Sequence, residues 1–368
     1  MPNFISEDDI EQAVLQKLHQ QHGFQLLNCY TVDPNDLNDR SHRTDKHDVI
    51  LFDRLKAAAL RLNPGLPAHA IDKALAILTD SRSVMSPIAA NRAVDGLIRD
   101  GISIEYENER GRTEHGRVRV IDFNDFNSTE NAPQTNEYLA VSQLWIKGKQ
   151  TDRRPDILLY INGLPLVFIE LKNSNVKLQN AFDDNLTDYK RDIPQLFHTN
   201  AFCILSNALE TKIGSFIATW EYFFPWFRAE DEKEKIDRDG IESSGTSLER
   251  AIIGLCSPPK LLDYIENFIL YHKETQKIIA QNNQFIGVNK AIESFANREA
   301  KDGKLGVFWH TQGSGKSFSM IFYTRKITRK LTGNFTFVII AFTGTPLLGK
   351  DRKTHTWFGR PTISKKRD

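Results

Sequence analysis

An Asn-Gly pair between two apolar runs is the feature of this sequence that most constrains its fold. Residues 157–161 and 164–171 are almost wholly apolar, and Asn162-Gly163 joins them. Asn and Gly tolerate the positive φ angles that the tightest two-residue β-hairpins require. The sequence therefore predicts two strands joined in a hairpin, and charged residues at the ends of such apolar strands are more than a solvated edge.

Helical and β-type segments alternate around this hairpin. Ser6, followed by three acids and then apolar residues at helical spacing, predicts an N-capped helix that ends at Gly23. Further helices are expected over residues 49–62, after Pro67, from Pro87 to Gly101, and over residues 181–189 and 213–219. Further strands are expected over residues 102–106, 118–123, 138–145 and 202–206. The fold class is therefore α/β.

A charged segment divides the chain. Residues 228–242 contain seven acids and four bases, and a Ser-, Gly- and Thr-rich run follows at 243–247. Such a composition is typical of a hydrated linker. We therefore expect a first domain over residues 1–227, a charged linker and helical connector over 228–280, with the helix at 259–280, and a second α/β unit over 281–368.

Composition limits the class of protein. The net charge is +1, but residues 298–368 alone carry fifteen bases and four acids, which suits a polyanionic partner or an evenly solvated surface. Three widely spaced cysteines support neither a disulfide framework nor a zinc site. The acidic start is unlike a signal peptide, and the longest apolar runs are too short to span a membrane. A cytoplasmic protein without membrane association is expected.

The hairpin carries the clearest chemistry of the first domain. Asp156 opens one strand and Glu170 closes the next, while Glu170 and Lys172 share one face because strand side chains alternate. Phosphodiester hydrolysis needs a hard divalent cation held by carboxylates and a positive group near the developing charge. The nearby bases Arg153 and Arg154 would suit phosphate contacts, as would Lys147 and Lys149. The alternative is a surface ion pair at the end of a hairpin.

This pattern resembles the PD-(D/E)xK nuclease family. Pro155-Asp156 matches its PD, and Glu170-Leu-Lys172 matches its ExK. The resemblance implies a restriction-endonuclease-like domain in which Asp156, Glu170 and Lys172 are catalytic and the two acids hold Mg²⁺. In that family an acid on a preceding helix often completes the site. Glu11 is the expected residue, with Glu7 second and a solvated helix surface as the alternative.

The segment after this motif resembles the nuclease domain of type I restriction enzyme motor subunits. That family has a QxxxY motif here, and this sequence has Asn185 four residues before Tyr189. The resemblance implies contacts to DNA from both residues, although Asn is one methylene shorter than Gln. Tyr189 could equally be a helical residue that packs on the sheet.

A phosphate-binding loop is expected in the second domain. An apolar run at 305–309 leads into His310-Thr-Gln-Gly-Ser-Gly-Lys-Ser317, and a helical segment follows. The backbone of Gly313, Ser314 and Gly315 would surround phosphate oxygens, Lys316 would reach the terminal phosphates, and Ser317 would hold magnesium. His310 stands where the strict pattern has Gly. The alternative is an ordinary glycine-rich turn.

This loop resembles the Walker A motif of the superfamily 2 translocase in the same motor subunits. The resemblance implies that ATP is a cofactor and that Gln284, in a Q-motif-like segment, reads the adenine edge. Residues 341–347 resemble motif III. The family's acidic DEAH-type box has no counterpart, because no Asp or Glu lies between Gly303 and Lys350. We therefore expect an incomplete RecA-like P-loop domain, shortened by an internal deletion near Ile340-Ala341, with little ATPase activity.

The resemblance as a whole implies the R subunit of a type I restriction-modification system. Such a subunit cleaves DNA and assembles with specificity and methyltransferase subunits. Two alternatives remain open at this point. One is an inactive remnant that binds DNA or partner subunits without cutting, and the other is a stand-alone DNA repair nuclease.

Overall fold

The fold is organised around a mixed seven-stranded sheet with strand order β1-β4-β5-β6-β7-β8-β9. The computed structural model describes residues 4–126, 134–308 and 315–338, and the compact unit discussed below ends at Leu331. The strands are β1 (Gln25–Asn28), β4 (Tyr138–Ser142), β5 (Ile157–Ile161), β6 (Leu164–Leu171), β7 (Phe202–Ser206), β8 (Thr211–Gly214) and β9 (Phe224–Pro225). The strands expected at 157–161, 164–171 and 202–206 are confirmed. The strand expected at 138–145 ends three residues earlier.

The hairpin between β5 and β6 forms as the sequence predicts. Asn162 and Gly163 have φ angles of 51° and 77°. The Asn162 side chain is fully buried and accepts a hydrogen bond from the backbone N–H of Glu137 at 2.8 Å. A Cβ atom on Gly163 would lie 2.4 Å from the carbonyl oxygen of Leu51, so the turn also requires the close backbone approach that only glycine permits.

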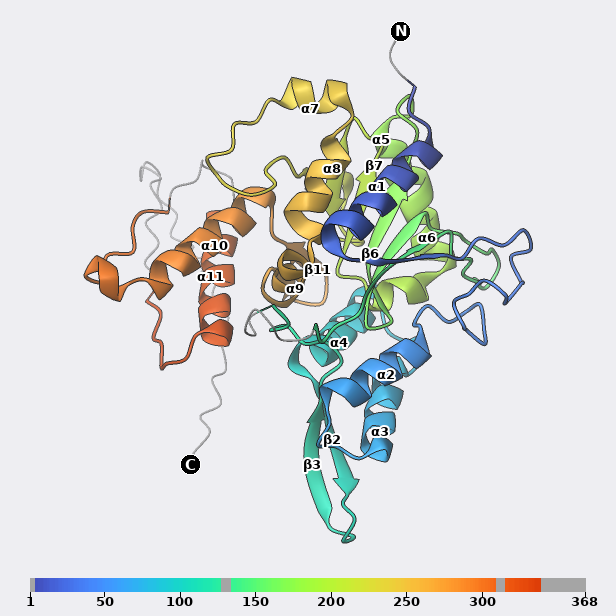
Figure 1. Cartoon of the computed structure of the whole chain (residues 1–368), viewed down its shortest axis with the longest axis vertical. Helices are drawn as coiled ribbons and strands as arrows, with labels where there is room; N and C mark the ends of the chain where they lie inside the picture. Colours follow the sequence, from blue (N-terminus) through green and yellow to red (C-terminus); the bar gives the residue numbers. More distant parts are fainter. Residues whose placement is uncertain (1–3, 127–133, 309–314, 339–368) are drawn as a thin grey trace, which may run out of the picture. The chain divides into compact units, whose positions relative to one another are not determined.

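Both faces of the sheet are buried, which explains why β5 and β6 are apolar apart from Glu170. Leu159 and Ile169 belong to one apolar cluster, and Leu158 and Phe168 to another. The cluster on the first face also takes in side chains of α1 (Glu7–His22), α2 (Phe52–Leu62), α3 (Ala68–Thr79) and α4 (Pro87–Asp100). The second is covered by α5 (Leu178–Asn180), a π-helical turn (Ala181–Leu186), α6 (Thr187–Asp192) and a 3₁₀ turn (Pro194–His198). Helix α1 lies beside β6 (Figure 1).

Two sequence expectations in this region are wrong. Residues 211–214 form strand β8 where a helix over 213–219 was expected, because this short segment pairs with β7. The strand expected at 118–123 lies earlier, as β3 (Thr113–Val118), which pairs with β2 (Ile102–Glu107). The four predicted helices before β2 are confirmed, although the second begins at Phe52. The helix expected at 181–189 is a π-helical turn that continues into α6.

The expected connector is helical only in its first part. It contains α7 (Arg238–Ser244), α8 (Ser247–Ala251), a π-helical turn (Ile252–Cys256) and α9 (Pro258–Asn267). Residues 269–279 then form a hairpin of β10 (Ile269–His272) and β11 (Gln276–Ile279), so the helix expected through 280 is wrong. Leu248 and Tyr264 join the apolar cluster of the first sheet face. The domain boundary at 228 stays a prediction.

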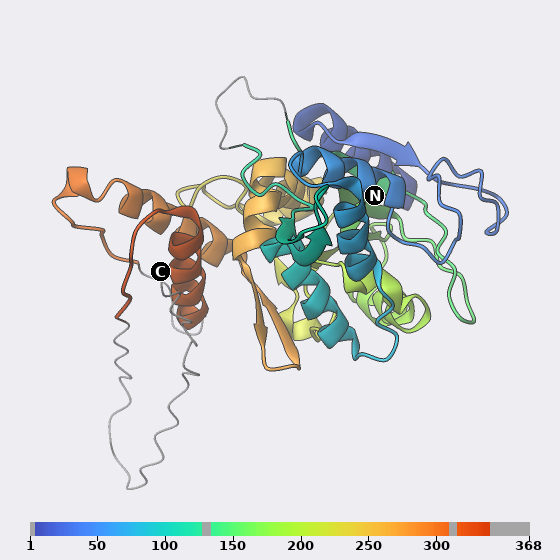
Figure 2. The same ribbon diagram turned by 90° about the horizontal axis from the view of Figure 1, so that it is seen from below.

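The β10–β11 hairpin is held beside α4 (Figure 2). Lys277 of β11 is only 5 % exposed and donates a hydrogen bond to Asn91 Oδ1 of α4 at 3.0 Å. Tyr271 of β10 donates to the same oxygen at 2.6 Å. This hairpin therefore fixes the connector to the sheet domain.

Helices dominate the described part of the last segment. It contains α10 (Asn282–Ala296), a 3₁₀ turn (Glu299–Lys301) and α11 (Lys316–Lys330). Residues 305–308 are not a strand, and Val307 is 92 % exposed. An apolar run forms a strand only when another strand supplies its hydrogen-bond partners, and the described residues offer this run none. Of the described helices, none is long and apolar enough to span a membrane.

Candidate active site

Asp156, Glu170 and Lys172 come together at one end of the central hairpin. Because Ile157 of β5 pairs with Ile169 of β6, Asp156 and Glu170 lie on neighbouring strands just beyond that pair. One carboxylate oxygen of Asp156 accepts a hydrogen bond from the backbone N–H of Leu171 at 2.7 Å. Lys172 Nζ lies 3.4 Å from Glu170 Oε1 and donates to the Leu171 carbonyl at 2.9 Å.

Burial disfavours the charged forms of Asp156 and Glu170. It raises the pKa of Asp156 from 3.8 to about 6, against the Leu171 N–H and the Lys172 ammonium, which lower it. Burial also raises the pKa of Glu170 well above its ordinary value, and the nearby Asp156 adds to the effect. Glu170 is 1 % exposed, and its Oε2 has no hydrogen-bond partner. A buried carboxylate oxygen without a partner is unfavourable unless something else satisfies it.

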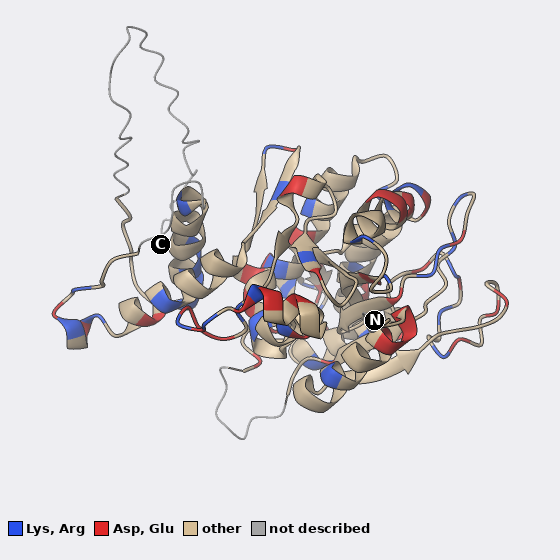
Figure 3. Ribbon diagram, turned by 90° about the horizontal axis from the view of Figure 1, so that it is seen from above, with Lys and Arg blue, Asp and Glu red and all other residues tan. Residues whose placement is uncertain are grey.

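Helix α1 brings two further glutamates to this region. Ser6 caps the helix, and its acidic first turn faces the observer in Figure 3. Glu11 is 6 % exposed, and burial, with help from Asp156, raises its pKa to about 7. Glu7 lies closer to the lysine, with Oε1 at 3.9 Å from Lys172 Nζ. Helical spacing of four residues places both acids on the face of α1 nearest the hairpin.

Gln143 is a site residue that sequence reasoning missed. Its side-chain amide donates a hydrogen bond to Glu11, and its backbone N–H donates to the Asp156 carbonyl at 3.0 Å. It directly follows β4 and has a φ of 56°, which is unusual for a residue other than glycine. Together with Glu11 it lines a surface pocket of about 600 Å³. No local sequence signal marks this residue.

A divalent cation fits the two central acids. Hard cations prefer carboxylate oxygens, and the partnerless Glu170 Oε2 beside Asp156 is the kind of oxygen that such an ion satisfies. In the described ranges no three His, Cys, Asp or Glu side chains lie close enough to hold one metal together. The fit therefore rests on Asp156 and Glu170, and the part of Glu11 in this site stays a prediction.

The expected DNA-contacting residues have intramolecular partners. Arg153 pairs with Asp188 at 2.7 Å and also with Asp192, and the Arg154 guanidinium lies 5.0 Å from both the Tyr30 and Trp145 rings. Asn185 and Tyr189 both form hydrogen bonds next to the β5–β6 hairpin. The Asn185 amide donates to Glu170 Oε1 at 2.5 Å, and the Tyr189 hydroxyl donates to the Arg154 carbonyl at 3.0 Å. Tyr189 packs edge-on against Phe168 of β6. Contact of these four residues with DNA stays a prediction.

The expected nucleotide loop is described only at its end. His310, Gly313, Ser314 and residues 341–347 lie outside the described residues. Gly315, at φ 73°, precedes α11, which confirms the helix expected after the loop. The Gln284 amide donates to the Gly315 carbonyl at 3.0 Å, so this residue contacts the loop backbone. Lys316 and Ser317 begin α11 and are exposed.

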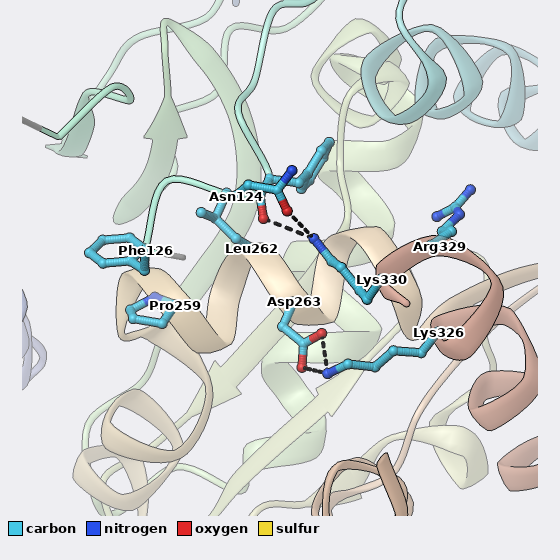
Figure 4. Close-up of a pocket in the computed structure, with 9 residues that line it drawn as sticks. Asn124, Phe126, Pro259, Leu262, Asp263, Lys326, Arg329 and Lys330 are labelled. Carbon is cyan, nitrogen blue, oxygen red and sulfur yellow. Dashed lines mark hydrogen bonds and ion pairs between the residues drawn. The ribbon is translucent and has the colours of Figure 1, made fainter. Parts of the chain in front are cut away.

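Ion pairs tie the other end of α11 to the connector. Lys326 pairs with Asp263 at 2.6 Å, and Lys330 pairs with Glu266 at 2.6 Å, both acids being on α9. Lys330 also donates to Asn124 at 2.9 Å. Asn124, Asp263, Lys326 and Lys330 are among the residues that line a pocket of about 580 Å³ (Figure 4). Because its lysines are matched by acids, this pocket is not a strongly positive site.

Two known families match parts of this chain. Residues 4–222, more than half of the chain, match the family described as type I restriction enzyme R protein N terminus. The chain therefore belongs to this family. Residues 283–340 match the SWI2/SNF2 ATPase family, the part of the chain in which the nucleotide loop is expected.

Alignments with two individual relatives cover most of this chain. The type I restriction enzyme HindI endonuclease subunit of Haemophilus influenzae is 36 % identical over 88 % of this chain and 30 % of its own length. A putative type I restriction enzyme MjaIXP endonuclease subunit of Methanocaldococcus jannaschii is 29 % identical over 91 % of this chain and 32 % of its own length. The chain thus spans about a third of these relatives.

Proposed function

We propose that this chain cleaves DNA by divalent-metal-dependent phosphodiester hydrolysis, as the nuclease part of a type I restriction R subunit. The observation that carries the proposal is the pair of buried carboxylates, Asp156 and Glu170, beside the ammonium of Lys172. Glu170 keeps one oxygen without a partner. Family membership and the relatives named as endonuclease subunits support the same activity.

Each residue of the site has a distinct part in the proposed chemistry. Magnesium, held by Asp156 and Glu170, would supply Lewis-acid polarisation of the scissile phosphate. The Lys172 ammonium, 3.4 Å from Glu170, is placed to stabilise negative charge that develops on the phosphate. Asn185 holds Glu170 through a hydrogen bond to its other oxygen. Glu11 adds negative charge at the edge of the site.

The wider assignment is part of the same proposal. Residues 1–227 would form the PD-(D/E)xK domain, 228–280 the connector, and 281–368 an incomplete RecA-like domain that binds ATP. The SWI2/SNF2 match over residues 283–340 supports the last of these. DNA would be the substrate, with specificity and methyltransferase subunits as partners.

Cleavage and metal binding by the purified chain test the proposal together. Supercoiled plasmid is incubated with Mg²⁺ or with EDTA, and Mg²⁺ binding is measured by calorimetry. We expect Mg²⁺-dependent nicking that Asp156→Asn, Glu170→Gln and Lys172→Met each abolish, with metal binding lost in the first two. Glu210→Gln, an exposed acid on the β7–β8 turn, is the matched control.

Two results would count against the proposal. Cleavage that persists in the Asp156→Asn protein would place the nuclease site elsewhere. Metal binding without any cleavage would favour an inactive remnant.

A further inference from the structure

Gln143 hydrogen-bonds both to Glu11 of helix α1 and to the backbone of Asp156 at the start of β5. Its side-chain amide donates to Glu11 of α1, and its backbone N–H donates to the carbonyl of Asp156. The two acids lie 145 residues apart in the sequence and on different elements. A single residue therefore links the position of the Glu11 carboxylate to the start of β5.

The backbone of Gln143 is held in an unfavourable conformation. At a φ of 56° a residue other than glycine is strained by about 1 kcal/mol or more, and such residues cluster at functional sites. Gln143 lies directly after β4, where Ser142 pairs with Ile157 of β5. The left-handed turn thus occurs where the chain leaves the sheet beside Asp156.

The amide of Gln143 carries no charge. A lysine or arginine at this position would place a positive charge against Glu11, whereas an amide holds the carboxyl group by a hydrogen bond without adding a charge. Among the described residues Glu11 does not form a three-ligand group with Asp156 and Glu170, so we assign it a place outside the immediate ligands. Residues that orient such outer groups commonly change metal affinity by 10-fold to 100-fold.

We propose that Gln143 is a positioning residue that holds the Glu11 carboxylate toward the divalent-cation site formed by Asp156 and Glu170. The inference rests on the proposed function, because it presumes that these two acids bind a metal. It goes further in assigning the link between α1 and the hairpin to one uncharged side chain.

A double-mutant cycle on metal affinity tests this role without measuring cleavage. Mg²⁺ and Mn²⁺ affinities are measured by calorimetry for the wild-type chain, Glu11→Gln, Gln143→Ala and the double variant. Each single change should weaken binding about 10-fold. The double variant should bind no more weakly than either single variant. Glu11→Gln removes the carboxylate, and Gln143→Ala removes the hydrogen bond that orients it, so both changes remove one and the same contribution to metal binding. Gln12→Ala, an exposed residue lining the same pocket, should bind as the wild type does.

Two further variants separate the side chain from the backbone turn. Asn tolerates a left-handed backbone better than Gln but is one methylene shorter, and Gly removes the strain entirely. Gln143→Asn and Gln143→Gly should therefore fold at least as stably as the wild type in urea denaturation yet bind metal as weakly as Gln143→Ala.

Several outcomes would overturn the inference while leaving the nuclease proposal intact. These are wild-type affinity in Gln143→Ala or Gln143→Gly, and losses that multiply to about 100-fold in the double variant. A wild-type chain that binds no divalent cation at all would instead refute the proposed function, and this inference with it.

Discussion

Lys277 is expected to destabilise the folded chain at neutral pH, and its replacement by methionine tests this. The side chain is 5 % exposed, and burial lowers its pKa from 10.5 to about 8, although Asp95 favours the charged form. This lowering of the pKa means that the folded state disfavours the charged form of Lys277 by about 3 kcal/mol relative to the unfolded chain. Methionine has a similar length and carries no charge to desolvate.

The acceptors of Lys277 keep other donors in this variant. Asn91 Oδ1 still accepts from the Tyr271 hydroxyl at 2.6 Å, and the Asn200 carbonyl still accepts from the Asn91 amide at 2.9 Å. Asp95 keeps its ion pair with Arg99. Because no buried partner is left unpaired, we expect Lys277→Met to raise the free energy of unfolding at pH 7 by about 1 to 3 kcal/mol.

The effect should depend on pH with a definite sign. Between about pH 8 and 10.5 the unfolded chain holds the Lys277 proton and the folded chain has released it. The stability contribution of Lys277 therefore rises with pH across this window, and at lower pH it stays at its minimum. The advantage of the methionine variant should be largest at pH 7 and should shrink by more than half at pH 9.5.

Urea denaturation at pH 7 and pH 9.5 measures both effects. Lys235→Met, at an exposed position, is the control for replacing a lysine in general. The reasoning would be refuted if Lys277→Met were destabilised at pH 7, or if its stability difference from the wild type were the same at both pH values.

Three further predictions concern the hairpin and the nucleotide loop. Gly163→Ala should destabilise the chain by more than about 2 kcal/mol in urea denaturation, because its Cβ would lie 2.4 Å from the Leu51 carbonyl oxygen at a φ of 77°; an unchanged midpoint would contradict the turn geometry. Asn162→Ala should cost about 3 kcal/mol, since three buried hydrogen bonds, to Glu137, Val120 and Asn136, are lost; a loss below 1 kcal/mol would show that these bonds contribute little. The chain should bind ATP weakly without releasing phosphate, because no acid lies between Gly303 and Lys350 to position magnesium; DNA-stimulated phosphate release that Lys316→Ala removes would show that another acid completes the site.

Elements with strong local signals could be predicted from the sequence. The capping box between Ser6 and Asp9 fixes the start of α1, and the left-handed Gly23 fixes its end. Asn162-Gly163 fixes the hairpin turn and the pairing of Ile161 with Leu164 beside it. In each case the residues that determine the structure are neighbours in the chain.

Elements that depend on distant partners could not be predicted. Residues 211–214 and 269–279 have apolar patterns too short to separate strand from helix, and pairing with β7 or within β10–β11 decides their structure. At residues 305–308 the opposite occurs. The apolar run predicts a strand, yet among the described residues it has no strand to pair with.

The candidate site divides in the same way. Asp156, Glu170 and Lys172 could be brought together from the sequence because the hairpin places strand ends side by side. Gln143 could not, because its importance comes from contacts with α1 and β5 and from a backbone angle that no local motif marks. Asn185 was identified by its spacing to Tyr189, but its observed partner is Glu170.

The position of Glu170 gives a physical reason to regard the site as functional. Every other residue of β6 is apolar and buried, and Glu170 itself is only 1 % exposed. An apolar side chain there would pack without desolvating a carboxyl group or leaving an oxygen without a partner. Buried polar groups that lower the stability of the fold are common in active sites, because their chemistry is required for function. Asp156 and Lys172 beside it supply the second metal-binding carboxylate and the cation that hydrolysis of a phosphodiester requires, so burial and chemistry point to the same three residues.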